Sequence, residues 1–240
     1  MLILGIDSSS KSASAAVLDS ANGKLLSEIN SGGTLSHSEN LMPMIDYALK
    51  TAGISVNDID LFAVASGPGS FTGIRIAVAT IKGLAFGENS SANCVSVSSL
   101  YALAHNFVGF DLGVDLNDAL ICPVIDARRR QVYNALFTLK SGEPHYITAD
   151  RLVTLDELAI ELEQYTDKAI IFTGDAADIC YNELKFDGRK IKAPDILKRS
   201  SGYAICVAAL REYNKNGAIN ANALAPAYLI KAQAERELKE

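Results

Sequence analysis

The sequence LILGIDSSS at residues 2–10 is an apolar strand that ends in a carboxylate and three hydroxyl groups. The sequence LICPVID at residues 120–126 is a strand of the same kind and also ends in an aspartate. A constant shift of 119 residues places Asp7 on Asp126, and the residues that follow the two strands repeat one order of predicted elements. These observations indicate that the chain is internally duplicated.

Each half is predicted to contain three antiparallel strands followed by a helix, a strand and a helix. Asn22-Gly23 supplies a hairpin turn, and the same shift places Gly23 on Gly142. Capping boxes that begin at Ser36 and Thr154 mark the first helix of each half. The elements predicted for the first half are strands at 2–7, 13–19, 24–30, 61–66 and 95–97 and helices at 36–53, 73–86 and 98–107. Those for the second half are strands at 120–126, 131–139, 145–148 and 169–173 and helices after 154, from 174 and at 200–215.

Two β-β-β-α-β-α halves side by side are the layout of the nucleotide-binding fold of actin, Hsp70 and the sugar kinases (ASKHA), an α/β fold. By this analogy we expect an N-terminal half at residues 1–108, which a C-terminal helix at 226–240 joins, and a C-terminal half at 109–225. A fold of this kind hosts many activities, so it does not fix the function by itself.

The composition narrows the class of protein. Hydrophobic residues make up 49% and charged residues 21% of 240 residues, which is typical of a globular chain. Since we find neither a leader sequence nor an apolar run of about 18 residues, we expect a cytoplasmic protein with no membrane contact. The net charge of −6 is the wrong sign for a protein that binds nucleic acid by itself. The four cysteines, none in a Cys-x-x-Cys pair, are predicted to be reduced core thiols.

Two loops are candidates for phosphate contact. In the analogous fold, the turn that here carries Asp7, Ser8 and Ser9 faces the phosphates and their metal, since its amides and carboxylate suit an anion and a hydrated cation. The loop with Gly67 and Gly69 lies before a helix and can also cradle an anion. The alternatives are a strand end that satisfies its own turn and a tight turn between strand and helix. No lysine follows in the P-loop register.

The sequence offers no catalytic or metal-binding constellation. The three histidines, His37, His105 and His145, are not spaced i, i+3 or i, i+4, so a helix-borne metal pair cannot form. No nucleophile elbow is present either. Two hypotheses remain at this point: a subunit that acts by binding a partner, and an autonomous ATP-dependent kinase or hydrolase that uses Asp7, Ser9 and the Gly67 loop.

Two helices are candidates for a protein interface. The helix at 73–86 carries only two charges, Arg75 and Lys82, so nearly all of its surface must be covered. The helix before it has a second stripe with His37, Met44 and Tyr47. These helices form either a buried layer or a surface that packs on another chain. The one basic cluster, at residues 128–130, is either a solvated turn or a contact for RNA or a partner.

Several motifs together resemble the TsaB family, also called YeaZ, over essentially the full chain. They are GIDSS at 5–9, HSxxL at 37–41, SGPGSFTGIRI at 66–76, KGLA at 82–85 and PxYL at 226–229, of which the string at 67–76 is the most specific. The family is the non-catalytic subunit in bacterial synthesis of threonylcarbamoyladenosine on tRNA, at the adenosine 3′ of the anticodon. The resemblance implies a platform for the kinase-like paralogue TsaD, with the ATPase TsaE joining the complex.

The resemblance also implies which groups this chain lacks. TsaD carries a metal on a His-x-x-x-His pair, and the matching positions here are Ser99 and Leu103. We therefore expect no cofactor on this chain alone, with ATP and metal on partner subunits and tRNA contact only through the complex. The two helices form the self-dimer or the TsaD contact in this family, and helical geometry selects the interface side chains His37, Leu41, Met44, Tyr47, Ala48, Arg75, Ala79 and Lys82.

Overall fold

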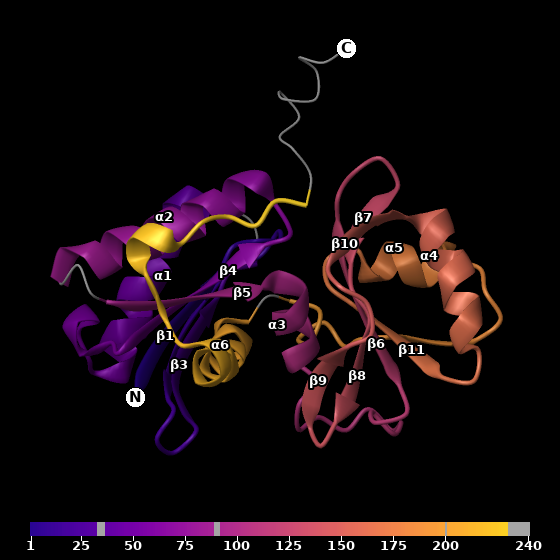
Figure 1. Cartoon of the computed structure of the whole chain (residues 1–240), viewed down its shortest axis with the longest axis horizontal. Coiled ribbons are helices and arrows are strands. Elements are labelled where there is room, and N and C mark those ends of the chain that lie inside the picture. Colours follow the sequence, from indigo (N-terminus) through magenta and orange to yellow (C-terminus); the bar gives the residue numbers. More distant parts are fainter. Residues whose placement is uncertain (33–36, 89–91, 200, 230–240) are drawn as a thin grey trace, which may run out of the picture.

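The computed structural model describes residues 1–32, 37–88, 92–199 and 201–229. Within it the chain forms two sheets that lie side by side, each with helices on its faces (Figure 1). The duplication predicted from the sequence is present, because β1 (Leu2–Asp7) and β6 (Leu120–Asp126) are central strands of the two sheets. All four cysteines are buried free thiols, as predicted. In the described ranges, no helix combines the length and the apolar character that crossing a bilayer requires.

The first sheet has six strands in the order β13-β5-β4-β1-β2-β3. The strands other than β1 are β2 (Ser14–Asp19), β3 (Lys24–Asn30), β4 (Leu61–Gly67), β5 (Asn93–Ser98) and β13 (Ile219–Asn220). β1 pairs antiparallel with β2 and parallel with β4, which in turn is parallel to β5. The carboxyl ends of the three parallel strands therefore meet at one edge, where Asp7, Gly67 and Ser98 lie.

The second sheet repeats this plan with shorter strands. Its members are β7 (Gln131–Asn134), β8 (Phe137–Lys140), β9 (Glu143–Tyr146), β10 (Arg151–Thr154), β11 (Ala169–Thr173) and β12 (Arg189–Lys192). The strand predicted at 131–139 is divided in two, because the buried amide of Asn134 donates a 3.0 Å hydrogen bond to the carbonyl of Pro123 and Leu136 binds Thr148. The third strand lies at 143–146, and β10 and β12 were not predicted.

Helices cover both faces of each sheet. They are α1 (His37–Ala52), α2 (Phe71–Glu88), α3 (Ser99–His105), α4 (Leu155–Leu162), α5 (Ala177–Glu183) and α6 (Gly202–Asn216), with short 3-10 turns at Val56–Asp58, Glu163–Tyr165 and Ala221–Ala223. α1 and α2 pack on one face of the first sheet around Leu4, Ile6 and Phe62. α4 and α5 pack on the outer face of the second sheet.

The two remaining helices correct the predicted domain boundaries. α6, which the sequence placed in the half at 109–225, packs on the first sheet against Ile3, Ala16 and Leu61. α3, placed in the half at 1–108, packs with Leu100 and Phe107 on the second sheet. Each half is thus completed by a helix from the other part of the sequence, and α3 and α6 lie next to each other between the sheets (Figure 1).

The C-terminal segment also differs from the prediction. Residues 226–229 are irregular rather than helical, and the rest of the helix predicted at 226–240 lies outside the described residues. The segment is attached to the first half, because the amide of Ala227 donates a 2.8 Å hydrogen bond to the carbonyl of Ser66. It runs along α2 toward the gap between the two halves (Figure 1).

Candidate functional site

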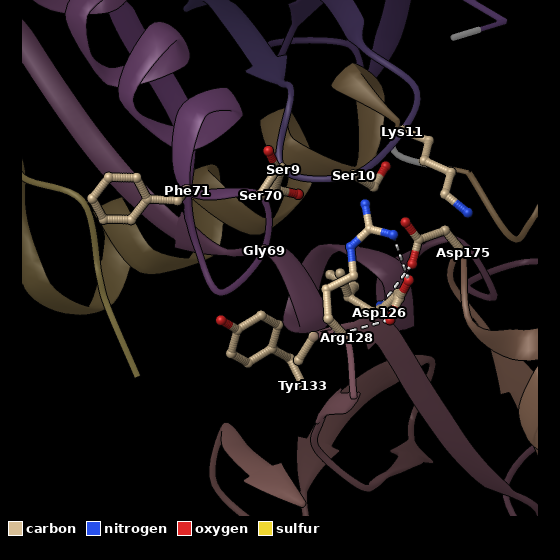
Figure 2. A pocket seen from close by; sticks show the side chains of 12 residues that line it. Ser9, Ser10, Lys11, Gly69, Ser70, Phe71, Asp126, Arg128, Tyr133 and Asp175 are labelled. Atoms are coloured by element: carbon tan, nitrogen blue, oxygen red, sulfur yellow. Dashed lines mark hydrogen bonds and ion pairs between the residues drawn. The ribbon is translucent and has the colours of Figure 1, made fainter. Parts of the chain in front are cut away.

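A cavity of about 350 Å³ lies between the two halves, where the turns that follow β1 and β6 face each other. Figure 2 shows Ser9, Ser70 and Phe71 on the side of the first half and Asp126, Arg128 and Tyr133 on the side of the second. This is the place where the analogy with the nucleotide-binding fold puts a nucleotide. The chemistry of the cavity therefore decides whether this chain keeps that role.

In the first candidate loop, Asp7-Ser8-Ser9, the side chains of Asp7 and Ser8 form hydrogen bonds with the backbone of the chain itself. Asp7 is only 1% exposed, and one of its carboxylate oxygens accepts a 2.6 Å hydrogen bond from the Ser9 amide. Ser8 is fully buried and its hydroxyl donates to the carbonyl of Gly73 at 2.8 Å. Because the carboxylate of Asp7 is enclosed, it offers no oxygen to a hydrated cation in the cavity. The Ser8 hydroxyl thus contacts the backbone as the alternative predicts, whereas the Ser9 hydroxyl has no hydrogen-bond partner among the described residues and lines the cavity.

At the second candidate loop, Gly67 to Gly69, other backbone segments of the chain occupy the space beside the glycines. A Cβ atom on Gly69 would lie 2.2 Å from the carbonyl oxygen of Ser9, which also accepts a 2.7 Å hydrogen bond from the Ser70 amide. A Cβ atom on Gly67 would lie 2.6 Å from the carbonyl oxygen of Ala227. Both glycines are therefore required for contact between segments of this chain. The amide of Ser70 is no longer available to a phosphate.

The second half contributes a turn with mixed charge. Asp126 accepts a 2.8 Å hydrogen bond from the Arg128 amide, and its other oxygen lies 3.7 Å from the Arg128 guanidinium. Asp175 accepts a 2.9 Å hydrogen bond from the Asp126 amide. Burial raises the pKa of Asp175, and the charge of Lys11 offsets part of this effect. Two carboxylates and two cations thus line the cavity, so their formal charges balance.

The positions that the family resemblance sets against a metal-binding histidine pair lie in the core. Ser99 and Leu103 are 1% and 4% exposed, and the Ser99 hydroxyl has no hydrogen-bond partner in the described chain. His105 is also buried, and burial lowers its pKa to about 4. Its two ring nitrogens contact the Tyr101 carbonyl at 2.9 Å and the Arg211 guanidinium at 2.7 Å. Among the residues that the structure describes, no three His, Cys, Asp or Glu side chains group as metal ligands do.

The predicted interface divides into buried and exposed residues. Leu41, Met44 and Ala48 are 1%, 7% and 0% exposed, because this face of α1 packs on the first sheet. The prediction that these three side chains make contacts at the surface is therefore wrong. Tyr47 is 63% exposed, Arg75 and Ala79 are exposed, and Lys82 is half-buried. His37 begins α1, and its side chain is outside the described part.

The exposed face of α2 continues beyond the predicted residues. Gly83 and Phe86 lie on it one and two turns after Ala79, and Met42 of α1 is exposed as well. A Cβ atom on Gly83 would have no neighbour within 4 Å. This face therefore carries two small residues, Ala79 and Gly83, beside the cations Arg75 and Lys82, and it ends in the exposed ring of Phe86. A helix from another chain can approach such a face closely.

Tyr228 contacts the beginning of α2 and was not predicted as a site residue. Its hydroxyl lies 2.6 Å from the Arg75 Nε atom, which donates a hydrogen bond to it. Its ring stacks on Phe71 at 4.9 Å between centroids, and the Arg75 guanidinium lies 3.9 Å from the centre of the Phe71 ring. These contacts fix the Arg75 side chain at the end of α2 that faces the cavity. Tyr228 belongs to the same PxYL motif that supported the family resemblance.

The duplicated sheets, the paired turns and the exchanged helices define a protein of the actin-like, or ASKHA, fold class. A solved structure of YeaZ from Pseudomonas aeruginosa has the same fold, with a TM-score of 0.78, 23% identity, and coverage of 95% of this chain and 99% of that one. A family model described as TsaD, tRNA N6-adenosine threonylcarbamoyltransferase, matches residues 33–238.

Curated relatives make the assignment more specific. A protein of Bacillus subtilis named tRNA threonylcarbamoyladenosine biosynthesis protein TsaB is 33% identical over 72% of this chain and 71% of its own length. The protein of the same name from Haemophilus influenzae is 28% identical over 95% of this chain and 93% of its length. The chain belongs to the TsaB family, within the wider group that the TsaD model describes.

Proposed function

We propose that this chain is a non-catalytic scaffold subunit in the synthesis of threonylcarbamoyladenosine on tRNA, at the adenosine 3′ of the anticodon. The names of its TsaB relatives support the pathway. In this proposal the chain binds and activates its catalytic paralogue TsaD, and TsaE joins the complex. ATP and the metal ion belong to those subunits, and tRNA reaches this chain only within the complex, in the cytoplasm.

One observation carries the proposal: the carboxylate and amide groups predicted to bind metal and phosphate are engaged within the chain, while α2 keeps a helix face open. The Asp7 carboxylate is enclosed and the Gly69 loop rests on Ser9. In contrast, Ala79 lies exposed between Arg75 and Lys82, and Gly83 is exposed next to Lys82. Small residues allow two helices to approach closely, and the cations can set the register of a partner. The same face serves a self-dimer when TsaD is absent.

Light scattering coupled to gel filtration tests the scaffold role. The chain alone is expected to elute as a homodimer, and mixing with the TsaD homologue of the same genome is expected to give a 1:1 heterodimer. The physical reason is that both complexes bury the same α2 face, so they exclude each other. A chain whose elution is unchanged by an excess of the TsaD homologue would contradict the proposal.

The alternative function, an autonomous ATP-dependent kinase or hydrolase, is tested by calorimetric titration with Mg-ATP. We expect no heat of binding at millimolar nucleotide, because the enclosed Asp7 and the consumed Ser70 amide leave no site for the metal and the phosphates. The Gly69 loop would have to leave Ser9 before a phosphate could enter. Binding of Mg-ATP by the isolated chain with a Kd below about 1 mM would favour the kinase or hydrolase instead.

A further inference from the structure

Three consecutive arginines adopt the left-handed backbone conformation, which residues other than glycine rarely adopt. Arg128, Arg129 and Arg130, between β6 and β7, have φ angles of 68°, 53° and 58°. Each such residue costs roughly 1 kcal/mol or more, and strained positions of this kind concentrate at binding sites. A turn needed only to connect two strands would be more stable with glycine or asparagine. The arginine side chains must therefore contribute something that offsets this cost.

Backbone hydrogen bonds and ion pairs hold the turn in place. The Arg128 carbonyl accepts a 3.0 Å hydrogen bond from the Gln131 amide, and the Arg130 carbonyl accepts one of 3.0 Å from the Leu155 amide. The Arg130 guanidinium donates to Glu183 at 2.7 Å and lies 3.8 Å from Asp156. Arg130 therefore anchors the turn to α5 and to the start of α4. Its positive charge is paired with carboxylates of the same chain.

Arg128 and Arg129 do not anchor the turn to a neighbouring helix as Arg130 does. Arg129 is exposed, and its side chain makes no hydrogen bond or ion pair with any residue that the structure describes. The Arg128 side chain is 82% exposed and has only a 3.7 Å ion pair with Asp126. It extends into the cavity between the two halves, as Figure 2 shows. The turn thus presents one guanidinium group, that of Arg128, in the cavity and a second, exposed one, that of Arg129, on the next residue.

We infer that Arg128 and Arg129 contact phosphate groups of the RNA that the complex binds. A guanidinium group matches phosphate geometry with two parallel donors, and a rigid turn loses little entropy when it binds. Tyr133 lines the same cavity as Arg128, and unpaired bases of RNA stack on such rings. An aromatic ring beside exposed arginines favours single-stranded RNA over an acidic protein surface. The contact rests on the proposed function, since a chain with a net charge of −6 does not hold RNA without a partner.

The test compares variants of the turn within the complex reconstituted with the TsaD and TsaE homologues. Arg129→Asn removes the charge and keeps a residue that tolerates this conformation, whereas Arg129→Lys keeps the charge. Lys140→Asn removes one exposed charge at the end of β8 and is the matched control. Affinity for the unmodified tRNA substrate is measured over a series of salt concentrations.

We expect Arg129→Asn to reduce the slope of log affinity against log salt by about 0.7, which weakens binding about fivefold at roughly 0.1 M salt. Arg128→Asn with Arg129→Asn doubles the change in slope, and Arg129→Lys and Lys140→Asn leave it unaltered. Equal tRNA affinity of the double variant and the original complex overturns the inference. Light scattering on the same samples shows whether each variant still forms the complex with TsaD, so a loss of assembly is distinguished from a loss of tRNA affinity. Loss of the complex with TsaD would show a protein contact at this turn, which also overturns the RNA contact.

Discussion

Replacing Gly5 by alanine is expected to lower the free energy of unfolding by about 3 kcal/mol, the upper part of the range for overpacking a core. Gly5 lies in the middle of β1, where α6 crosses the strand. A Cβ atom at this position would lie 2.5 Å from the carbonyl oxygen of Gly202 and 2.6 Å from the sulfur of Cys206. The first of these atoms belongs to the backbone, so the clash cannot be relieved by rotating a side chain.

The start of α6 has little freedom to move away. The Gly202 amide donates a 2.7 Å hydrogen bond to the Ser14 hydroxyl, and Glu28 accepts hydrogen bonds from the Ser201 hydroxyl at 2.9 Å and the Tyr203 amide at 3.1 Å. Moving α6 outward would break these contacts along β2 and β3. The cost of the methyl group therefore appears as lost stability rather than as a small shift of the helix.

Urea denaturation followed by circular dichroism measures the effect, with Gly83→Ala as the control. Gly83 lies in α2 with no atom within 4 Å of an added Cβ, so alanine there is expected to stabilise the chain by about 0.5–1 kcal/mol. Two Gly→Ala changes of opposite sign separate the steric effect from the backbone entropy. If Gly5→Ala unfolded within about 0.5 kcal/mol of the original chain, the close approach of α6 to β1 would be wrong.

The same contact explains what the sequence could not predict about the fold. The strands were found because apolar runs ending in Asp7 and Asp126 repeat at a fixed spacing. The exchange of α3 and α6 between the halves leaves no such signal. It depends on the fit of Gly5 against Gly202, where both residues lack a side chain, and hydrophobic periodicity records only side chains.

The candidate site was predicted unevenly for a related reason. The turn at Asp7 and the loop at Gly69 were each named as phosphate candidates from their own sequences. The structure brings them into contact, because the Ser70 amide donates to the Ser9 carbonyl, and the Asp7 carboxylate accepts from the Ser9 amide. For α1, a wide apolar stripe does not reveal which of its edges faces the sheet, so the buried Leu41 and Ala48 were placed at the surface. Tyr228 contacts Arg75 across 153 residues, and no local pattern indicates such a pairing.

Placing a carboxylate on the open face of α2 is expected to abolish the complex with TsaD. Ala79→Glu adds a long charged side chain where the proposed partner helix approaches, and burying an unpaired charge costs several kcal/mol. Since about 1.4 kcal/mol corresponds to a factor of ten, affinity is expected to fall at least 100-fold. Ala79 is exposed in the protomer, so the variant is expected to fold, and it is expected to elute as a monomer because the same face serves the self-dimer.

The matched control is Ala21→Glu, the same substitution at an exposed position in the turn between β2 and β3. This turn lies at the end of the molecule away from α2 (Figure 1), so the control adds equal charge without touching the proposed interface. Light scattering of each variant with the TsaD homologue then separates two causes. Loss of the complex with Ala79→Glu alone is the expected result, and loss with both variants would indicate general charge repulsion. A complex that forms normally with Ala79→Glu would exclude this face of α2 as the docking surface, because a helix packed on Ala79 and Gly83 leaves no room for the glutamate.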